Sequence, residues 1–215
     1  MPQLVRREPS ALLLAAQLLG VLVYPFMEGN DVGGALFSVF GILVLGLVVL
    51  AVRDKPGLTW VALLLGAPAT VLLVTQAVTQ DDALLPYSSA LEALLYLYAA
   101  GALIAYMLAD HEVTRDELFA VGATFTLVAW AFAYVYVVLQ AIEPHSFTAA
   151  VDANDPRTWM ELLFLSFTTL SSTGLGDVIP VRPHARSIVM VEQLAGLAYV
   201  AIVVSRLVGL TVTRR

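Results

Sequence analysis

Six stretches of the chain are apolar for about 20 residues, the length that an α-helix needs to cross the hydrocarbon core of a bilayer. They lie near residues 10–27, 33–52, 57–77, 87–109, 118–141 and 185–210. Polar backbone groups in lipid must be paired within the segment, so each stretch is predicted to be a helix. The first stretch ends at Glu28 and not at a small-residue cleavage site, which favours a retained helix over a signal peptide.

A long interruption, residues 142–184, separates the fifth and sixth stretches and contains a shorter apolar segment. Two helix-start signals precede that segment. Asp155 before Pro156 suits a cap followed by a first-turn proline, and Thr158 and Glu161 have the spacing of a capping box. A helix from residue 158 to about residue 171 would be only about 20 Å long, which is too short to span the membrane. We therefore expect this helix to enter the membrane and turn back.

The sequence SSTGLGD, residues 171–177, follows the short predicted helix. It must leave the membrane as non-helical backbone, which is tolerated only where it lines a water-filled path or is buried in protein. Gly174 and Gly176 allow backbone angles that turn successive carbonyls to one side, and rings of such carbonyls can replace the water shell of a cation. One chain cannot close a ring, so a cyclic oligomer is expected.

Composition supports a membrane protein and narrows its chemistry. The chain is 60% hydrophobic and 13% charged, with a mean hydropathy of +0.85, which lies outside the range of soluble globular domains. It has no cysteine and three histidines, so we expect neither a structural metal nor a cofactor. The net charge of -6 leaves no polybasic face, so membrane lipids are expected partners and nucleic acid is not.

Basic residues set the expected orientation, because cytoplasmic loops hold the excess of Lys and Arg. If both termini are cytoplasmic, only Arg157, Arg182 and Arg186 lie outside, and all other Lys and Arg residues lie inside. The pattern predicts a multi-pass protein of the cell membrane with residues 142–184 on its extracytoplasmic face.

The segment TTLSSTGLGD, residues 168–177, resembles the pore signature of the potassium-channel superfamily, T-T-x-T-T-V-G-Y-G-D. It departs from that signature at Ser171, Ser172, Thr173 and Leu175. The resemblance implies one hydroxyl and four backbone carbonyls that bind permeant potassium, supplied by Ser172, Thr173, Gly174, Leu175 and Gly176. It also implies filter support from Thr168, Thr169 and Ser171, and it places Asp177 at the outer mouth.

Residues 177–210 resemble the post-filter loop and inner helix of prokaryotic channels with a two-pore potassium-channel-type pore domain. Gly196 lies where the gating-hinge glycine of that family usually lies, although glycine in a membrane helix also serves close packing. The resemblance covers about half the chain. It implies an all-α membrane protein with six transmembrane helices, a re-entrant pore helix between helices five and six, and assembly as a homotetramer. The pore domain would cover residues 111–215, and a peripheral four-helix domain would cover residues 1–110.

Two departures from the family bear on function. Residues 87–109 contain no Arg or Lys, whereas voltage-gated members carry a row of arginines in this helix, so weak or no voltage dependence is expected. Leucine at position 175 resembles the second pore loop of some animal two-pore potassium channels and is compatible with potassium selectivity. However, Leu165 and Leu175 cannot donate the hydrogen bonds that usually brace the filter, and a looser filter discriminates less between potassium and sodium.

Three titratable residues are further candidates. Glu92 and Glu192 lie within apolar stretches, where a charge exposed to lipid is costly. Glu92 is interpreted as either a proton sensor or a hydrogen-bonded brace between helices, and Glu192 is expected to brace the short helix from behind. His111 lies between the fourth and fifth stretches and is either a pH-sensing group or part of a solvated linker.

The predicted function is a passive, potassium-permeable channel without a voltage sensor. The alternatives are a weakly selective sodium/potassium channel and a membrane protein that is not a channel. An intramembrane enzyme is disfavoured, because no His-x-x-x-His or Glu-x-x-His pattern occurs within a predicted helix. A secondary transporter is disfavoured because such proteins contain paired broken helices, and this sequence has one broken segment.

Overall fold

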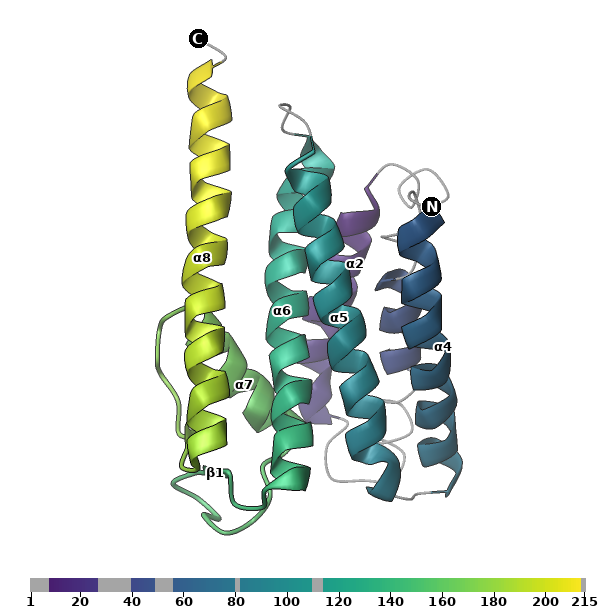
Figure 1. Cartoon of the computed structure of the whole chain (residues 1–215), viewed down its shortest axis with the longest axis vertical. Helices are drawn as coiled ribbons and strands as arrows, with labels where there is room; N and C mark the ends of the chain where they lie inside the picture. The colour runs from purple at the N-terminus through teal and green to yellow at the C-terminus, as the bar shows by residue number, and fades with distance from the viewer. Residues whose placement is uncertain (1–7, 27–39, 49–55, 80–81, 110–113, 214–215) are drawn as a thin grey trace. The chain divides into compact units, whose positions relative to one another are not determined.

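The computed structural model describes residues 8–26, 40–48, 56–79, 82–109 and 114–213, most of which are helical (Figure 1). The α-helices are α2 (Pro9–Val23), α4 (Pro56–Thr79), α5 (Leu85–Met107), α6 (Arg115–Ile142), α7 (Trp159–Leu170) and α8 (Pro183–Thr213). The shorter elements are the 3-10 turns η1 (Tyr24–Phe26) and η2 (Asp82–Leu84) and the strands β1 (Phe147–Thr148) and β2 (Ile179–Pro180). The predicted all-helical architecture is confirmed.

Five helices within these described ranges are long and apolar enough to cross a membrane. They are Pro9–Phe26, Thr59–Thr79, Leu85–Met107, Arg115–Ile142 and Pro183–Arg206. They correspond to five of the six predicted stretches. Of the remaining stretch, 33–52, residues 40–48 are helical and the rest lies outside the described residues. A total of six spans therefore stays a prediction.

The chain divides into two compact units, Met1–Val128 and Ala129–Arg215, and α6 contributes to both. In the first unit, α4 packs against α5. The backbone N–H and the hydroxyl of Ser10 donate hydrogen bonds to the buried carboxylate of Asp116 over 3.0 and 2.9 Å. Asp116 therefore satisfies a donor at the start of α2, where backbone N–H groups have no partner within the helix.

The second unit contains the end of α6 together with α7, α8 and the strand pair. Figure 1 shows α7 beside α8, and the chain after α7 runs back along α8 to the end where α8 begins. The predicted sequence of a short helix followed by a returning extended segment is thus observed. Its depth in a membrane stays a prediction.

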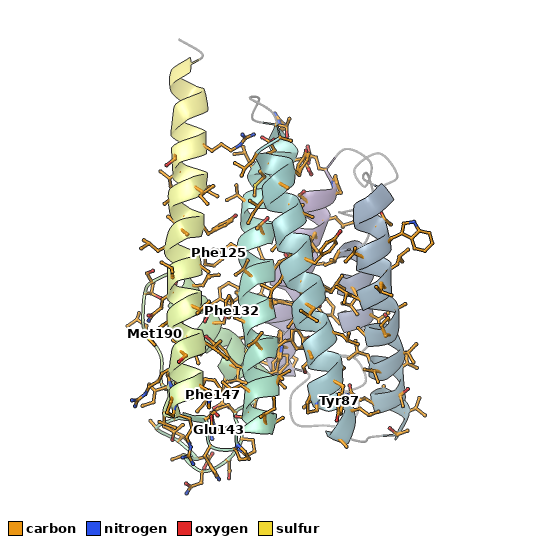
Figure 2. The ribbon with its side chains drawn as sticks, in the orientation of Figure 1. Tyr87, Phe125, Phe132, Glu143, Phe147 and Met190 are labelled. Carbon is orange, nitrogen blue, oxygen red and sulfur yellow. The ribbon has the colours of Figure 1, made fainter. Side chains whose placement is uncertain are left out.

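Helix α8 buries one narrow stripe and exposes the rest of its apolar surface. The buried stripe repeats every three or four residues and consists of Ala185, Val189, Glu192, Gly196 and Tyr199. Outside the stripe, Met190 is 60% exposed and lies on the side of α8 opposite α6 (Figure 2). A helix that is apolar on all sides is typical of a membrane span or of a helix covered by further subunits.

Candidate functional site

Helix α7 begins with a capping box. The Thr158 hydroxyl accepts a hydrogen bond from the backbone N–H of Glu161 (3.3 Å), and the Glu161 carboxylate accepts one from the backbone N–H of Thr158 (2.7 Å). The predicted capping box is confirmed. The predicted cap at Asp155 is wrong, because the Asp155 backbone N–H donates to the Asp152 carbonyl (3.0 Å) in a turn that precedes the helix.

Arg157 is buried and connects the loop before α7 to α6 and to the first turn of α7. Its guanidinium donates to three backbone carbonyls of this loop, those of Val151, Asp152 and Asp155. It also forms an ion pair with Glu161 over 3.0 Å. The backbone N–H and carbonyl of Arg157 both bond to the side-chain amide of Gln140, near the end of α6. These roles of Arg157 were not predicted from the sequence, although its four-residue spacing from Glu161 was a usable signal.

A tight turn connects α7 to the candidate segment. The Ser172 N–H donates to the Thr169 carbonyl over 3.0 Å. The Gly174 N–H and the Thr173 hydroxyl donate to the Thr168 carbonyl over 3.0 and 3.2 Å. Ser172 and Gly174 have φ angles of 59° and 65°, in the left-handed region that favours glycine. The structure thus joins five residues of the predicted site in one hydrogen-bonded turn.

Residues 171–177 are all exposed, and Leu175 is 73% exposed. Within the part of the chain that the structure describes, no hydrogen bond is donated to the backbone carbonyls of residues 172–176. A backbone carbonyl removed from water needs a polar partner. These consecutive oxygen atoms are therefore available to a partner from outside the chain, such as water or a cation.

A pocket of about 410 Å³ lies beside the end of α7. Its lining comes from α7, the segment after it and the middle of α8, namely Thr168, Thr169, Ser172, Gly174, Gln193, Leu194 and Leu197. The pocket therefore brings together four of the predicted site residues. The three residues from α8 were not predicted, because nothing local in the sequence indicates which face of α8 meets the end of α7.

The chain beyond Asp177 is fixed to the loop that follows α6. Strands β1 and β2 pair antiparallel, with Phe147 opposite Pro180. Next to this pair, the Val181 N–H donates to the Ser146 carbonyl over 2.9 Å. Glu143, directly after α6, and Phe147 of β1 both lie at this end of the unit (Figure 2). These contacts hold the exit of the candidate segment, while α7 holds its start.

Gly196 and Glu192 are two of the α8 residues that contact α7. A Cβ atom placed on Gly196 would lie 2.0 Å from the carbonyl oxygen of Leu170, so Gly196 permits a very close approach of the two helices. This contact gives Gly196 a packing role, and its hinge role stays a prediction. Glu192 is fully buried and contacts Ser166 of α7, which confirms the expected position of this carboxyl group behind the short helix.

Two other titratable candidates were named from the sequence, Glu92 and His111. Glu92 is buried in α5, within the first unit. His111 lies outside the described residues. Among the described residues, no group of three or more Asp, Glu or His side chains is arranged to hold a metal ion.

The region that contains α7 and α8 is similar to known proteins. A family model described as "Ion channel" matches residues 122–212, which include α7, the candidate segment and most of α8. Protein LctB of Geobacillus stearothermophilus is 34% identical over 103 residues, which cover 46% of this chain and 76% of that protein. Protein LctB of Bacillus caldotenax is 32% identical over 103 residues, with the same coverage. No solved structure matches the chain. The chain is a multi-pass membrane protein that belongs to the ion-channel family, within the potassium-channel superfamily.

Proposed function

We propose that the protein is a homotetrameric, potassium-selective channel of the cell membrane, with residues 172–176 as its selectivity filter. The observation that carries the proposal is the exposed run of backbone carbonyls after α7, to which no described residue donates a hydrogen bond. Such oxygen atoms can replace the hydration shell of potassium when several chains surround an axis. In this proposal α7 is the pore helix, and Asp177 lies at the outer mouth.

Hydrogen bonds from hydroxyl groups hold the candidate filter against the end of α7. The Ser171 and Thr173 hydroxyls bond to each other over 2.9 Å, and the Thr173 hydroxyl also donates to the Thr168 carbonyl. These short links tie the candidate filter to the end of α7. They support the proposal because Leu165 and Leu175 have no hydrogen-bonding group that could perform the same task.

The tetramer is supported by the polar backbone and the apolar helix surface that stay exposed in a single chain. Residues 171–177 are exposed beside an apolar face of α8, although polar backbone cannot face lipid. Four copies around an axis would place these segments along a water-filled path and cover part of each α8. The proposal assigns residues 111–215 to the pore domain and residues 1–110 to a peripheral domain. Both termini are cytoplasmic, and residues 142–184 lie outside.

The proposal is tested by ion flux from liposomes that contain the purified full chain. We expect the reversal potential under bi-ionic conditions to show a clear preference for potassium over sodium. Protein-free liposomes and the Gly174→Asp variant serve as controls. If the wild-type protein passes no more ions than protein-free liposomes do, the proposed channel function is wrong.

A weakly selective sodium/potassium channel is the second candidate. It is favoured by Leu175, whose side chain is 73% exposed and has no group that could brace the filter by a hydrogen bond. The same bi-ionic measurement separates the two candidates. A reversal potential near zero, together with robust flux of both ions, supports the second candidate and contradicts potassium selectivity.

We also expect little voltage dependence. Helix α5 carries no Arg or Lys, and moving one elementary charge across the membrane contributes only about 2.3 kcal/mol per 100 mV. Without such charges, voltage has no strong means of moving this helix. Conductance recorded in planar bilayers with equal potassium on both sides should therefore stay nearly constant as the voltage is stepped. A steep conductance–voltage curve contradicts this prediction.

A further inference from the structure

Glu192 of α8 is the centre of a buried polar cluster behind α7. The carboxyl group contacts the hydroxyl of Ser166, in the middle of α7, and the hydroxyl of Tyr136, in α6. Glu192 and Ser166 are fully buried, and so is Tyr136. Among the described residues, no Lys, Arg or His side chain forms an ion pair with Glu192. One carboxyl group therefore joins three helices without a counter-charge.

The number of available hydrogens indicates which state of Glu192 fits this cluster. The Ser166 hydroxyl lies within hydrogen-bonding distance of two acceptors, Oε1 of Glu192 and the Ala129 carbonyl, which is 2.8 Å away. A hydroxyl has one hydrogen and so serves one of them. A proton on Glu192 Oε1 satisfies every group, because Glu192 then donates to Ser166 and Ser166 donates to Ala129. Tyr136 donates to Oε2. An ionised carboxylate would leave the Ala129 contact without a hydrogen and would bury an uncompensated charge.

A second contact between α8 and α7 lies one helical turn after the bond between Glu192 and Ser166. Gly196 follows Glu192 by four residues and packs against Leu170, which follows Ser166 by four residues. Residues four apart lie on the same face of a helix. Helix α8 thus contacts α7 at two successive turns, by a hydrogen bond at the first and by close backbone packing at the second. The second contact lies directly before the segment 171–177.

We propose that Glu192 is a positioning residue that acts in its neutral form as a hydrogen-bond donor. It fixes α7 and thereby the spacing of the carbonyls at residues 172–176, so it contributes to the preference for potassium over sodium. This inference rests on the proposed function. The permeant ion does not touch Glu192, which acts through Ser166 and α7.

The test compares three variants of the full chain in liposomes by the ratio of potassium to sodium permeability. Glu192→Gln keeps one donor and one acceptor, so it should retain the wild-type ratio. Glu192→Leu leaves the two buried hydroxyls without this partner and should lower the ratio about tenfold. Met190→Leu, on the exposed face of α8, is the matched control. Infrared difference spectra of the wild type and Glu192→Gln should show the C=O band of a protonated carboxyl group.

Each outcome bears on a different claim. Wild-type selectivity in Glu192→Leu overturns the positioning role and leaves the proposed channel function standing. A loss of selectivity in Glu192→Gln, or the absence of the protonated carboxyl band, overturns the neutral donor. If Glu192→Leu does not fold, Ser166→Ala removes the same link from α7, and it should lower the ratio in the same direction. An unchanged ratio in Ser166→Ala then overturns the positioning role.

Absence of ion flux in the wild type overturns the proposed function and, with it, this inference.

Discussion

Replacing Gly174 by alanine is expected to reduce potassium flux more than about a hundredfold, and replacing it by aspartate is expected to abolish flux. Gly174 has a φ angle of 65°, a conformation that costs a residue with a Cβ atom roughly 1–2 kcal/mol. In a tetramer the same cost arises at four positions around one axis, or about 4–8 kcal/mol in total. In the proposed tetramer, aspartate would add four carboxylates beside the path of carbonyls, and conduction requires that ions are not held too tightly.

The matched control for this prediction is Gly101→Ala. An added Cβ atom meets no atom within 4 Å at either glycine, so the two substitutions are alike in the space they need. They differ in backbone conformation, because Gly101 lies within α5. The flux should therefore be unchanged in Gly101→Ala when both variants are reconstituted at equal protein density. Normal flux in Gly174→Ala would show that this part of the backbone does not line the ion path.

Local patterns in the sequence were sufficient to predict five long helices and the short helix α7. Long apolar stretches indicate membrane helices because the bilayer demands a minimum length, and five of them correspond to helices within the described residues. The start of α7 was predicted to the residue at Thr158, since a capping box depends only on residues three positions apart. The competing signal at Asp155 failed because Asp155 lies in the loop that is organised around the buried guanidinium of Arg157.

Contacts between distant parts of the chain could be predicted only in outline. Glu192 was expected to lie behind the short helix, but its bond to Tyr136 joins residues 56 positions apart, and no local pattern indicates that partner. Gln140 and Arg157 are 17 positions apart, and neither was expected to connect α6 with the start of α7. Such pairs depend on which helix faces meet. The apolar pattern of a membrane helix gives little information about faces, because lipid and protein interiors are both apolar.

The last residue of α7 packs closely against Gly196 in the middle of α8, and Gly196→Ala is expected to disrupt this contact. The added Cβ atom would lie 2.0 Å from the carbonyl oxygen and 2.8 Å from the carbonyl carbon of Leu170. Both are backbone atoms and cannot rotate away, so α7 or α8 must shift. Overpacking of this kind typically costs about 1–3 kcal/mol, and occasionally more. The shift would also disturb the bond between Glu192 and Ser166, one turn away.

Thermal stability and ion flux together distinguish packing from a hinge at Gly196. If Gly196 serves packing, Gly196→Ala should lower the temperature at which the purified protein is lost from its size-exclusion peak, and flux should fall in parallel. Gly46→Ala is the control, because an added Cβ atom at Gly46 has no neighbour within 4 Å. If Gly196 serves only as a hinge, alanine should preserve thermal stability, since alanine favours helix more than glycine does. Unchanged stability with reduced flux would therefore contradict the packing role. If α7 packs against α8 at Gly196, the added Cβ atom clashes with Leu170, and the helices must shift at a cost in stability.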